Sequence, residues 1–154
     1  MDSIVDPAAD YIWNAVATTI DLKGIHDRRP RTDEDWHELH RHAIHLVEAA
    51  NLIAIPGRKV AAGNSTVEHR EALDVSHIQQ RLDAGHDQLV GLADLVRQMG
   101  QELAEAADHK DVDAVFKSGG DLDAVCEACH RVFWYPDDPL PAELSSAADA
   151  KGAR

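Results

Sequence analysis

Shortages of three kinds narrow what this sequence can form. Aromatic residues make up 5% of its 154 residues and runs of β-branched residues are scarce, which argues against sheets. No apolar run approaches the roughly 20 residues that cross a bilayer, so we expect no membrane span. Basic residues are also few, with 15 Lys and Arg against 28 Asp and Glu and a formal net charge of -13. Such a surface repels phosphates and anionic lipid, which argues against nucleic acid and favours basic or neutral partners.

The length of the chain suits one domain with a single core. Its first residues, MDSIVDPAAD, lack the basic and then apolar order of an export signal. The chain can still be the mature form of an exported protein, because such a signal is removed during export.

Apolar positions recur every three or four residues, and this spacing predicts an all-α fold. The longest pattern predicts one helix of roughly 32 residues with a continuous apolar seam. The seam consists of Val75, Ile78, Leu82, Gly85, Leu89, Leu92, Val96, Met99, Leu103 and Ala106.

Caps and helix breakers predict three further helices, over residues 7–24, 33–54 and 111–134. Together with the long helix they predict an antiparallel four-helix bundle over residues 1–135, because long amphipathic helices cover one another's seams. Residues 136–154 contain prolines and small polar residues, so we expect a mobile or loosely docked tail.

The two cysteines lie close together in the last predicted helix, in the stretch CEACH at residues 126–130. On a helix, Cys126, Cys129 and His130 project from one face. Two thiols on one face can add across the vinyl groups of a porphyrin as thioethers, and the adjacent imidazole can bind the iron. C-x-x-C-H is the haem c attachment signature for this reason. We therefore expect one covalent haem c per chain, with His130 as the metal ligand.

Three other interpretations of the cysteines stay open. A zinc site needs four ligands, and only three are local, so a distant His would supply the fourth. A thioredoxin-like redox pair is expected at the start of a helix after a strand, whereas this pair lies late in a helix. Two structural cysteines beside a His are the third interpretation, since free Cys behaves as a small apolar residue. Haem attachment is favoured because the motif and its helical context agree.

The position of the motif indicates a kind of cytochrome. Class I c-type cytochromes carry the motif near the N-terminus and a ligating Met downstream, whereas this chain has no Met after Met99. A motif near the end of a helical bundle resembles the class II c-type cytochromes, the cytochrome c′ family. The resemblance rests on the final helix, FKSGGDLDAVCEACHRVF, with Phe133 three residues after the histidine, and on the helix order over residues 7–134. It implies a C-terminal haem-binding helix in which His130 is the proximal ligand.

The sequence departs from this family in its basic residues. Family members often place an Arg in the first helix near a haem propionate, yet no basic residue here precedes Lys23. We expect Arg58, Lys59 or the basic cluster at residues 28–31 to bind the haem propionates in place of that Arg.

The side chains opposite His130 decide between two functions. In cytochrome c′ proper an apolar residue of the first helix covers this face of the haem, whereas low-spin relatives place a Met there. The predicted first helix has no Met, His, Lys or Cys before Lys23, so the resemblance places Ile12, Trp13 and Val16 at the iron. Met99 is interpreted as a gap-filling core residue. An open iron position would bind small neutral gases such as NO or CO.

The chain has ten histidines, so nine besides His130 are rival ligands. Those of the second predicted helix do not converge on one buried point, which favours a solvated, pH-sensitive face over a metal site. They are His37, His40, His42 and His45. The remainder are interpreted as surface or helix-end residues: His26, His69, His77, His86 and His109.

The resemblance implies a mono-haem electron carrier rather than an enzyme. The acidic surface would attract a redox partner protein with a basic docking face. The alternative is a five-coordinate haem protein that binds or scavenges NO or CO. Haem c attachment in bacteria takes place outside the cytoplasm, which implies a periplasmic protein, and class II members are often homodimers.

Overall fold

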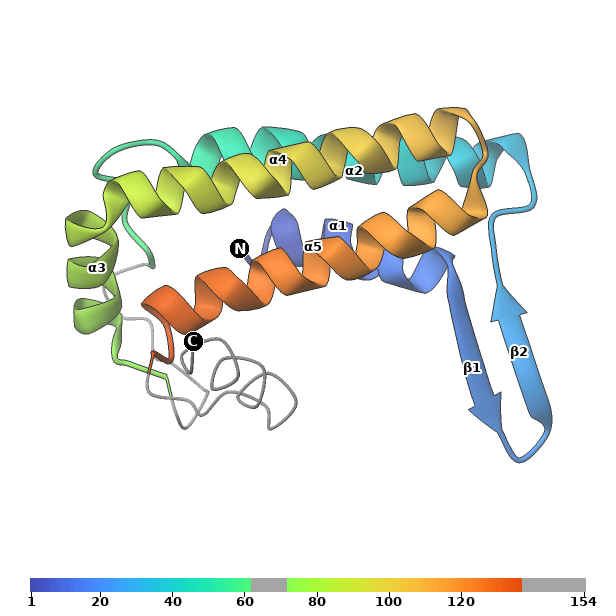
Figure 1. The fold of residues 1–154 in the computed structure, drawn as a ribbon, viewed down its shortest axis with the longest axis horizontal. Helices are drawn as coiled ribbons and strands as arrows, with labels where there is room; N and C mark the ends of the chain where they lie inside the picture. Colours follow the sequence, from blue (N-terminus) through green and yellow to red (C-terminus); the bar gives the residue numbers. More distant parts are fainter. Residues whose placement is uncertain (62–71, 137–154) are drawn as a thin grey trace, which may run out of the picture.

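The computed structural model describes residues 1–61 and 72–136. In these residues the chain forms five helices and one two-stranded sheet (Figure 1). The elements, in order, are α1 (Val5–Ala15), β1 (Ala17–Asp21), β2 (Gly24–Arg28), α2 (Asp33–Ile53), α3 (Val75–Ala84), α4 (His86–Asp108) and α5 (Val112–Phe133). The predicted tail lies outside the described residues except for Pro136. None of the described helices has the length and hydropathy to cross a membrane.

Helices α2 and α4 pack against each other along the length of the molecule (Figure 1). Gly100 of α4 lies directly against the backbone of α2. A Cβ at Gly100 would lie 2.9 Å from Val47 Cγ2 and 3.0 Å from the carbonyl oxygen of Ala43. Because two of its three nearest neighbours would be backbone atoms of α2, only glycine permits this approach.

The main core is completed by α1 and α5, which pack against α2 and α4. Its fully buried large side chains come from four helices and include Ile12, Leu39, Leu46, Leu103 and Leu122. The helical class of the fold is as expected from the apolar spacing.

The first helix was expected to run to Gly24, and this prediction is wrong. The helix ends at Ala15, and residues 17–28 form an antiparallel hairpin in which Thr19 pairs with His26. The segment from Val16 to Ile20 is mostly β-branched, which favours extended backbone over helix. Gly24 adopts a φ of +129°, a conformation that a side chain would strain, and so turns the chain back.

The hairpin projects away from the helices (Figure 1). It leaves Ile20, Leu22 and Ile25 exposed.

The predicted single helix over residues 75–106 is also wrong, because the chain breaks at Gly85 into α3 and α4. Gly85 has φ -105° and ψ 28°, outside the helical range. A Cβ there would lie 3.0 Å from Phe133 Cε1 and 3.1 Å from the carbonyl oxygen of Arg81. The break turns α3 across the end of α4 and α5 (Figure 1). Phe133 then forms a second core cluster with Ile78, Leu82 and Leu89.

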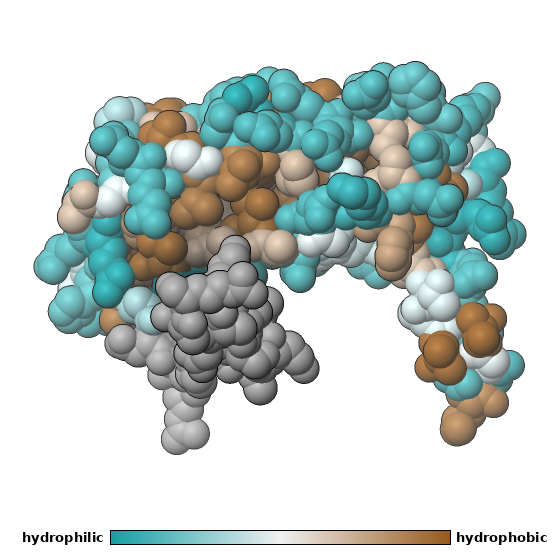
Figure 2. Space-filling model, viewed as in Figure 1, coloured by the Kyte–Doolittle hydropathy of each residue, from teal (hydrophilic) through white to brown (hydrophobic). Residues whose placement is uncertain are grey.

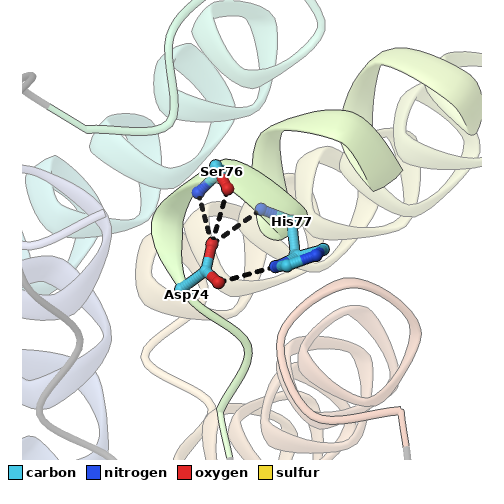
Figure 3. Close-up of polar contacts among 3 residues, drawn as sticks. All are labelled: Asp74, Ser76 and His77. Carbon is cyan, nitrogen blue, oxygen red and sulfur yellow. Dashed lines mark hydrogen bonds and ion pairs between the residues drawn. The ribbon is translucent and has the colours of Figure 1, made fainter.

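Asp74 begins α3 with a compact set of hydrogen bonds (Figure 3). Its Oδ1 accepts from the Ser76 backbone N–H at 2.9 Å, the Ser76 hydroxyl at 2.7 Å and the His77 backbone N–H at 3.0 Å. Its Oδ2 lies 2.6 Å from Nδ1 of His77. The hydrogen bond from the Ser76 hydroxyl, followed by those from His77, holds the pKa of Asp74 below its usual range. The helices predicted over residues 33–54 and 111–134 begin as expected, with Thr32 capping α2 and Asp111 capping α5. The helix predicted from residue 7 begins earlier, at Val5, and has no side-chain cap.

The Gly100 contact can be tested with a matched pair of substitutions in α4. We expect Gly100→Ala to lower the free energy of unfolding by about 1–3 kcal/mol, because the added methyl group pushes α2 and α4 apart. A Cβ at Gly91 has no neighbour within 4 Å. Gly91→Ala should therefore raise the free energy of unfolding by about 0.5–1 kcal/mol through helix propensity alone. Urea denaturation measures both values, and equal effects would contradict the close contact.

The Asp74 cap predicts a pH dependence of stability. Because the pKa of Asp74 is lowered in the folded state, its charge stabilises the fold above the unfolded pKa of about 4, and this stabilisation is lost as the pH falls further. Asp74→Ala should lower Tm at pH 7, and its difference from the unmodified protein should shrink toward pH 3. Asp74→Asn keeps an accepting oxygen without the charge, so its deficit should be smaller at pH 7. A deficit that grows on acidification would contradict the assignment.

Candidate functional site

The C-terminal half of α5 places the CEACH motif against a cavity. Cys126, Cys129 and His130 are half-buried and line one wall together. Cys126 packs against the main core and Cys129 against the second core cluster, so the cavity opens where the two cores meet. The cavity has a volume of about 210 Å³, below the roughly 300–1,000 Å³ of ligand sites, and it opens to solvent. A larger ligand would therefore extend beyond its mouth.

The remaining walls of the cavity are mainly apolar. Figure 2 shows apolar residues gathered in a hollow between α4 and α5. The apolar side chains come from the start of α1, the end of α2 and both α3 and α4, and include Val5, Leu52, Ile53, Leu82, Leu89, Leu92 and Val96. A flat apolar ring system would be desolvated between these helices.

Burial sets the chemistry of the two thiols. Loss of solvent raises the pKa of Cys126 to about 11, with Asp123 and Asp6 adding to the rise. Burial likewise raises the pKa of Cys129 to about 11, and Cys126 adds to it. Both thiols are therefore neutral at pH 7, whereas a dithiol redox pair depends on a thiolate. In residues 1–61 and 72–136, no three His, Cys, Asp or Glu side chains gather as a metal site does.

The end of α5 that carries His130 is held by several contacts. The His130 ring lies edge-on to Trp134, with ring centroids 6.0 Å apart. The carbonyl oxygen of His130 accepts hydrogen bonds from the backbone N–H groups of Trp134 at 2.7 Å and Tyr135 at 3.0 Å. The Tyr135 hydroxyl donates to Glu127 Oε2 at 2.7 Å. These contacts hold the last turn of the helix next to the cavity.

Two contacts from α3 and the residues before it hold the same end. The Leu73 backbone N–H donates to the carbonyl oxygen of Trp134 at 2.8 Å. Nη1 of Arg81 donates to the carbonyl oxygen of Val132 at 3.0 Å. The break at Gly85, which sequence reasoning missed, thus positions the motif.

The residues expected to face the iron lie elsewhere. Ile12, Trp13 and Val16 line a second cavity near the middle of α5, together with Phe116, and none of them lines the cavity of Cys126. Trp13 Nε1 donates to the carbonyl oxygen of Gly119 at 2.9 Å. The structure thus does not bring these three residues to the motif, because the start of α1, and not its middle, lines the cavity of the motif.

Met1 and His86 line the motif's cavity instead, and both carry atoms that can bind iron. Sequence reasoning set His86 aside as a surface residue and passed over Met1, which precedes α1. A signal was present, because Met1 continues the helical spacing of the buried Val5, Ala8 and Ile12. The Val5 backbone N–H also donates to the carbonyl oxygen of Met1 at 3.0 Å, as in a further helical turn.

The two sets of basic residues that were expected near the haem propionates line different cavities. Arg58 and Lys59 line the cavity of the motif, whereas Arg28 and Arg29 line another beside Tyr11. The structure thus brings one of the two candidate sets to the cysteines.

The histidines of α2 lie away from this cavity. His40 Nδ1 lies 2.8 Å from Asp108 Oδ1, and His42 stacks on Tyr11 with ring centroids 4.1 Å apart. Burial, and then His45, lower the pKa of His42. His69 lies outside the described residues, and Met99 packs against the main core as expected.

Comparison with models of protein families, with curated proteins and with solved structures yields no match for this chain. Two neutral thiols on an apolar wall, an imidazole beside them, and two cations at the same cavity fit a macrocycle with an apolar ring, a metal and acidic groups. Two cysteines and an adjacent histidine are the residues that haem c attachment uses.

Covalent attachment can be tested at the cysteines. After maturation in a host that attaches haem c, we expect haem to stay on the chain in a denaturing gel. Cys126→Ser or Cys129→Ser should each leave one thioether and shift the pyridine haemochrome band, because one vinyl group stays unsaturated. The double variant should lose covalent haem. Ala128→Ser, at an exposed position within the motif, is the matched control and should keep both thioethers. Haem retained on the double variant would contradict attachment at these residues.

Proposed function

We propose that the protein is a mono-haem c-type cytochrome of class II, which carries single electrons rather than catalysing a reaction. Cys126 and Cys129 would hold the haem as thioethers, and His130 would be the proximal ligand. One observation carries this proposal: the three residues line one wall of a cavity whose other walls are mainly apolar, as a porphyrin ring requires. The haem, when bound, supplies an iron that takes up and releases one electron.

The proposed class also gives roles to the helices. In this proposal α1, α2, α4 and α5 make the antiparallel four-helix bundle of class II cytochromes, and α5 is its haem-binding helix. The break at Gly85 and the hairpin formed by β1 and β2 are then additions to that bundle.

The residues of the cavity favour a filled sixth iron position. We propose Met1 as that ligand. Met1 lies one helical turn before the buried Val5 and lines the cavity, although 46% of its surface is exposed. A neutral thioether enters an apolar cavity at little desolvation cost, whereas an imidazole such as that of His86 loses hydrogen bonds to water. A Met opposite a His also suits an electron carrier, because it raises the reduction potential.

The charge of the protein fits a carrier that meets its partner by diffusion. A net charge of -13 attracts a partner with a basic docking face, with an encounter rate that falls as salt rises. We propose a periplasmic location, because haem c is attached outside the cytoplasm in bacteria. A homodimer remains part of the proposal through the class II resemblance.

Spectra of the reduced protein with and without CO test this function. We expect a low-spin spectrum that CO leaves unchanged, because Met1 fills the iron position that CO needs. Met1→Leu, made behind an export signal so that residue 1 is not the translation start, should become high-spin and bind CO. His86→Gln is the matched variant for the other donor and should keep the unmodified spectrum. A high-spin, CO-binding unmodified protein would instead favour the gas-binding function, with NO or CO as its ligand.

A further inference from the structure

The segment after α2 returns the chain to the cavity of the motif. Pro56 ends the helical pattern, and Gly57 adopts a φ of +70°, a conformation that favours glycine. The turn is closed by a hydrogen bond from the Arg58 backbone N–H to the carbonyl oxygen of Ile55, at 3.4 Å. As a result Arg58 and Lys59 are exposed at the mouth of the cavity that Cys126 lines from within.

Gln79 of α3 holds this segment on both sides of Lys59. Its Oε1 accepts from the Val60 backbone N–H at 2.9 Å, and its Nε2 donates to the carbonyl oxygen of Arg58 at 3.4 Å. Nε2 also donates to Asp83 Oδ1 at 2.8 Å. One side-chain amide therefore orients the backbone of two adjacent basic residues.

The local charge at this mouth is opposite to that of the whole protein. Arg58 and Lys59 are permanent cations, whereas Asp83 is the one acidic residue among the described residues that line the cavity. The Asp83 carboxylate already accepts a hydrogen bond from Gln79. Within residues 1–61 and 72–136, neither Arg58 nor Lys59 forms an ion pair, although 28 Asp and Glu outnumber 15 Lys and Arg in the chain. Two cations are thus available to an acidic ligand.

We infer that Arg58 and Lys59 form the binding site for the two propionate groups of the haem, with Gln79 as the positioning residue. This inference rests on the proposed function, because it concerns the same cavity. A haem whose apolar ring is buried between the helices leaves its carboxylates at the mouth. The guanidinium of Arg58 can bind one carboxylate through two parallel hydrogen bonds, and Lys59 supplies a point charge for the other.

The alternative basic cluster does not compete for this role. Arg28 Nη1 donates to Asn14 Oδ1 at 3.4 Å, and Arg28 and Arg29 line a different cavity beside Asp35. Arg28 can therefore serve as a matched control, because Arg28→Gln removes the same charge at a distance from the motif.

The test uses the holoprotein with its covalent haem. We expect Arg58→Gln, and the double variant Arg58→Gln with Lys59→Gln, to shift the propionate-bending band in resonance Raman spectra. The midpoint potential should also fall, because a removed cation no longer disfavours the ferric state. Arg28→Gln should change neither property. Arg58→Lys should keep most of the potential yet still shift the band, because it retains the charge and loses the paired hydrogen bonds.

Substitution of Gln79 tests whether this residue acts by positioning the two cations rather than through charge. Gln79→Ala removes no charge, yet it should shift the propionate band and lower the potential in the same direction as Arg58→Gln. In the double variant that lacks both cations, Gln79→Ala should add no further shift, because it acts through them. Gln80→Ala, at the exposed neighbouring position of α3, is the control and should leave both readouts unchanged.

The outcomes distinguish the two proposals. Variants that keep covalent haem in a denaturing gel but show an unchanged propionate band and potential would overturn the role of Arg58 and Lys59 and leave the cytochrome proposal standing. An additive effect of Gln79→Ala in the variant without both cations would overturn its positioning role. Absence of covalent haem from the unmodified protein would instead overturn the proposed function itself.

Discussion

The packing of Phe133 beneath Gly85 is the contact on which the arrangement of the site depends. With no Cβ at residue 85, the aromatic ring can approach the backbone between α3 and α4, and the chain turns there instead of continuing as one helix. The turn carries Gln79 to the segment at residues 58–60, and it directs Leu89 into the cavity. The same ring fixes the end of α5 three residues after His130. One contact thus sets the relative position of the motif, the apolar wall and the basic residues, although these lie far apart in the sequence.

Local patterns were enough to predict what one helix determines by itself. The predicted helix over residues 33–54 matches α2 closely, and that over 111–134 matches α5, because each has a capping residue and an unbroken apolar stripe. The end of the first helix and the break at Gly85 were both predicted wrongly for one reason. The prediction followed apolar spacing alone and ignored the backbone conformations that β-branched residues and glycine favour. The segment from Val16 to Ile20 was included in the first helix although four of its five residues are β-branched. Gly85 occupies a seam position only because nothing larger fits against Phe133.

The residues of the candidate site also differ in how well the sequence predicts them. The shared face of Cys126, Cys129 and His130 follows from the period of a helix, so the sequence was sufficient to predict it. Side chains from other helices depend on where those helices cross α5, which no local pattern contains. The middle of α1 meets α5 near Gly119, so Ile12, Trp13 and Val16 line a different cavity from the motif. Arg58 and Lys59 were predicted only as basic residues that the chain could bring near the haem propionates. The hydrogen bonds of Gln79 account for their position in the structure.

Charge acts in this protein over two separate ranges. The excess of acidic residues creates a field that a partner meets as it approaches, and salt weakens this field over about 8–10 Å. The two cations at the cavity act over the length of a hydrogen bond, where screening by salt is weak. A site that binds acidic groups can therefore exist on a strongly acidic surface without altering how the surface attracts basic partners. Gln79 makes this separation possible, because it holds the cations at the cavity through their backbone and leaves their side chains available.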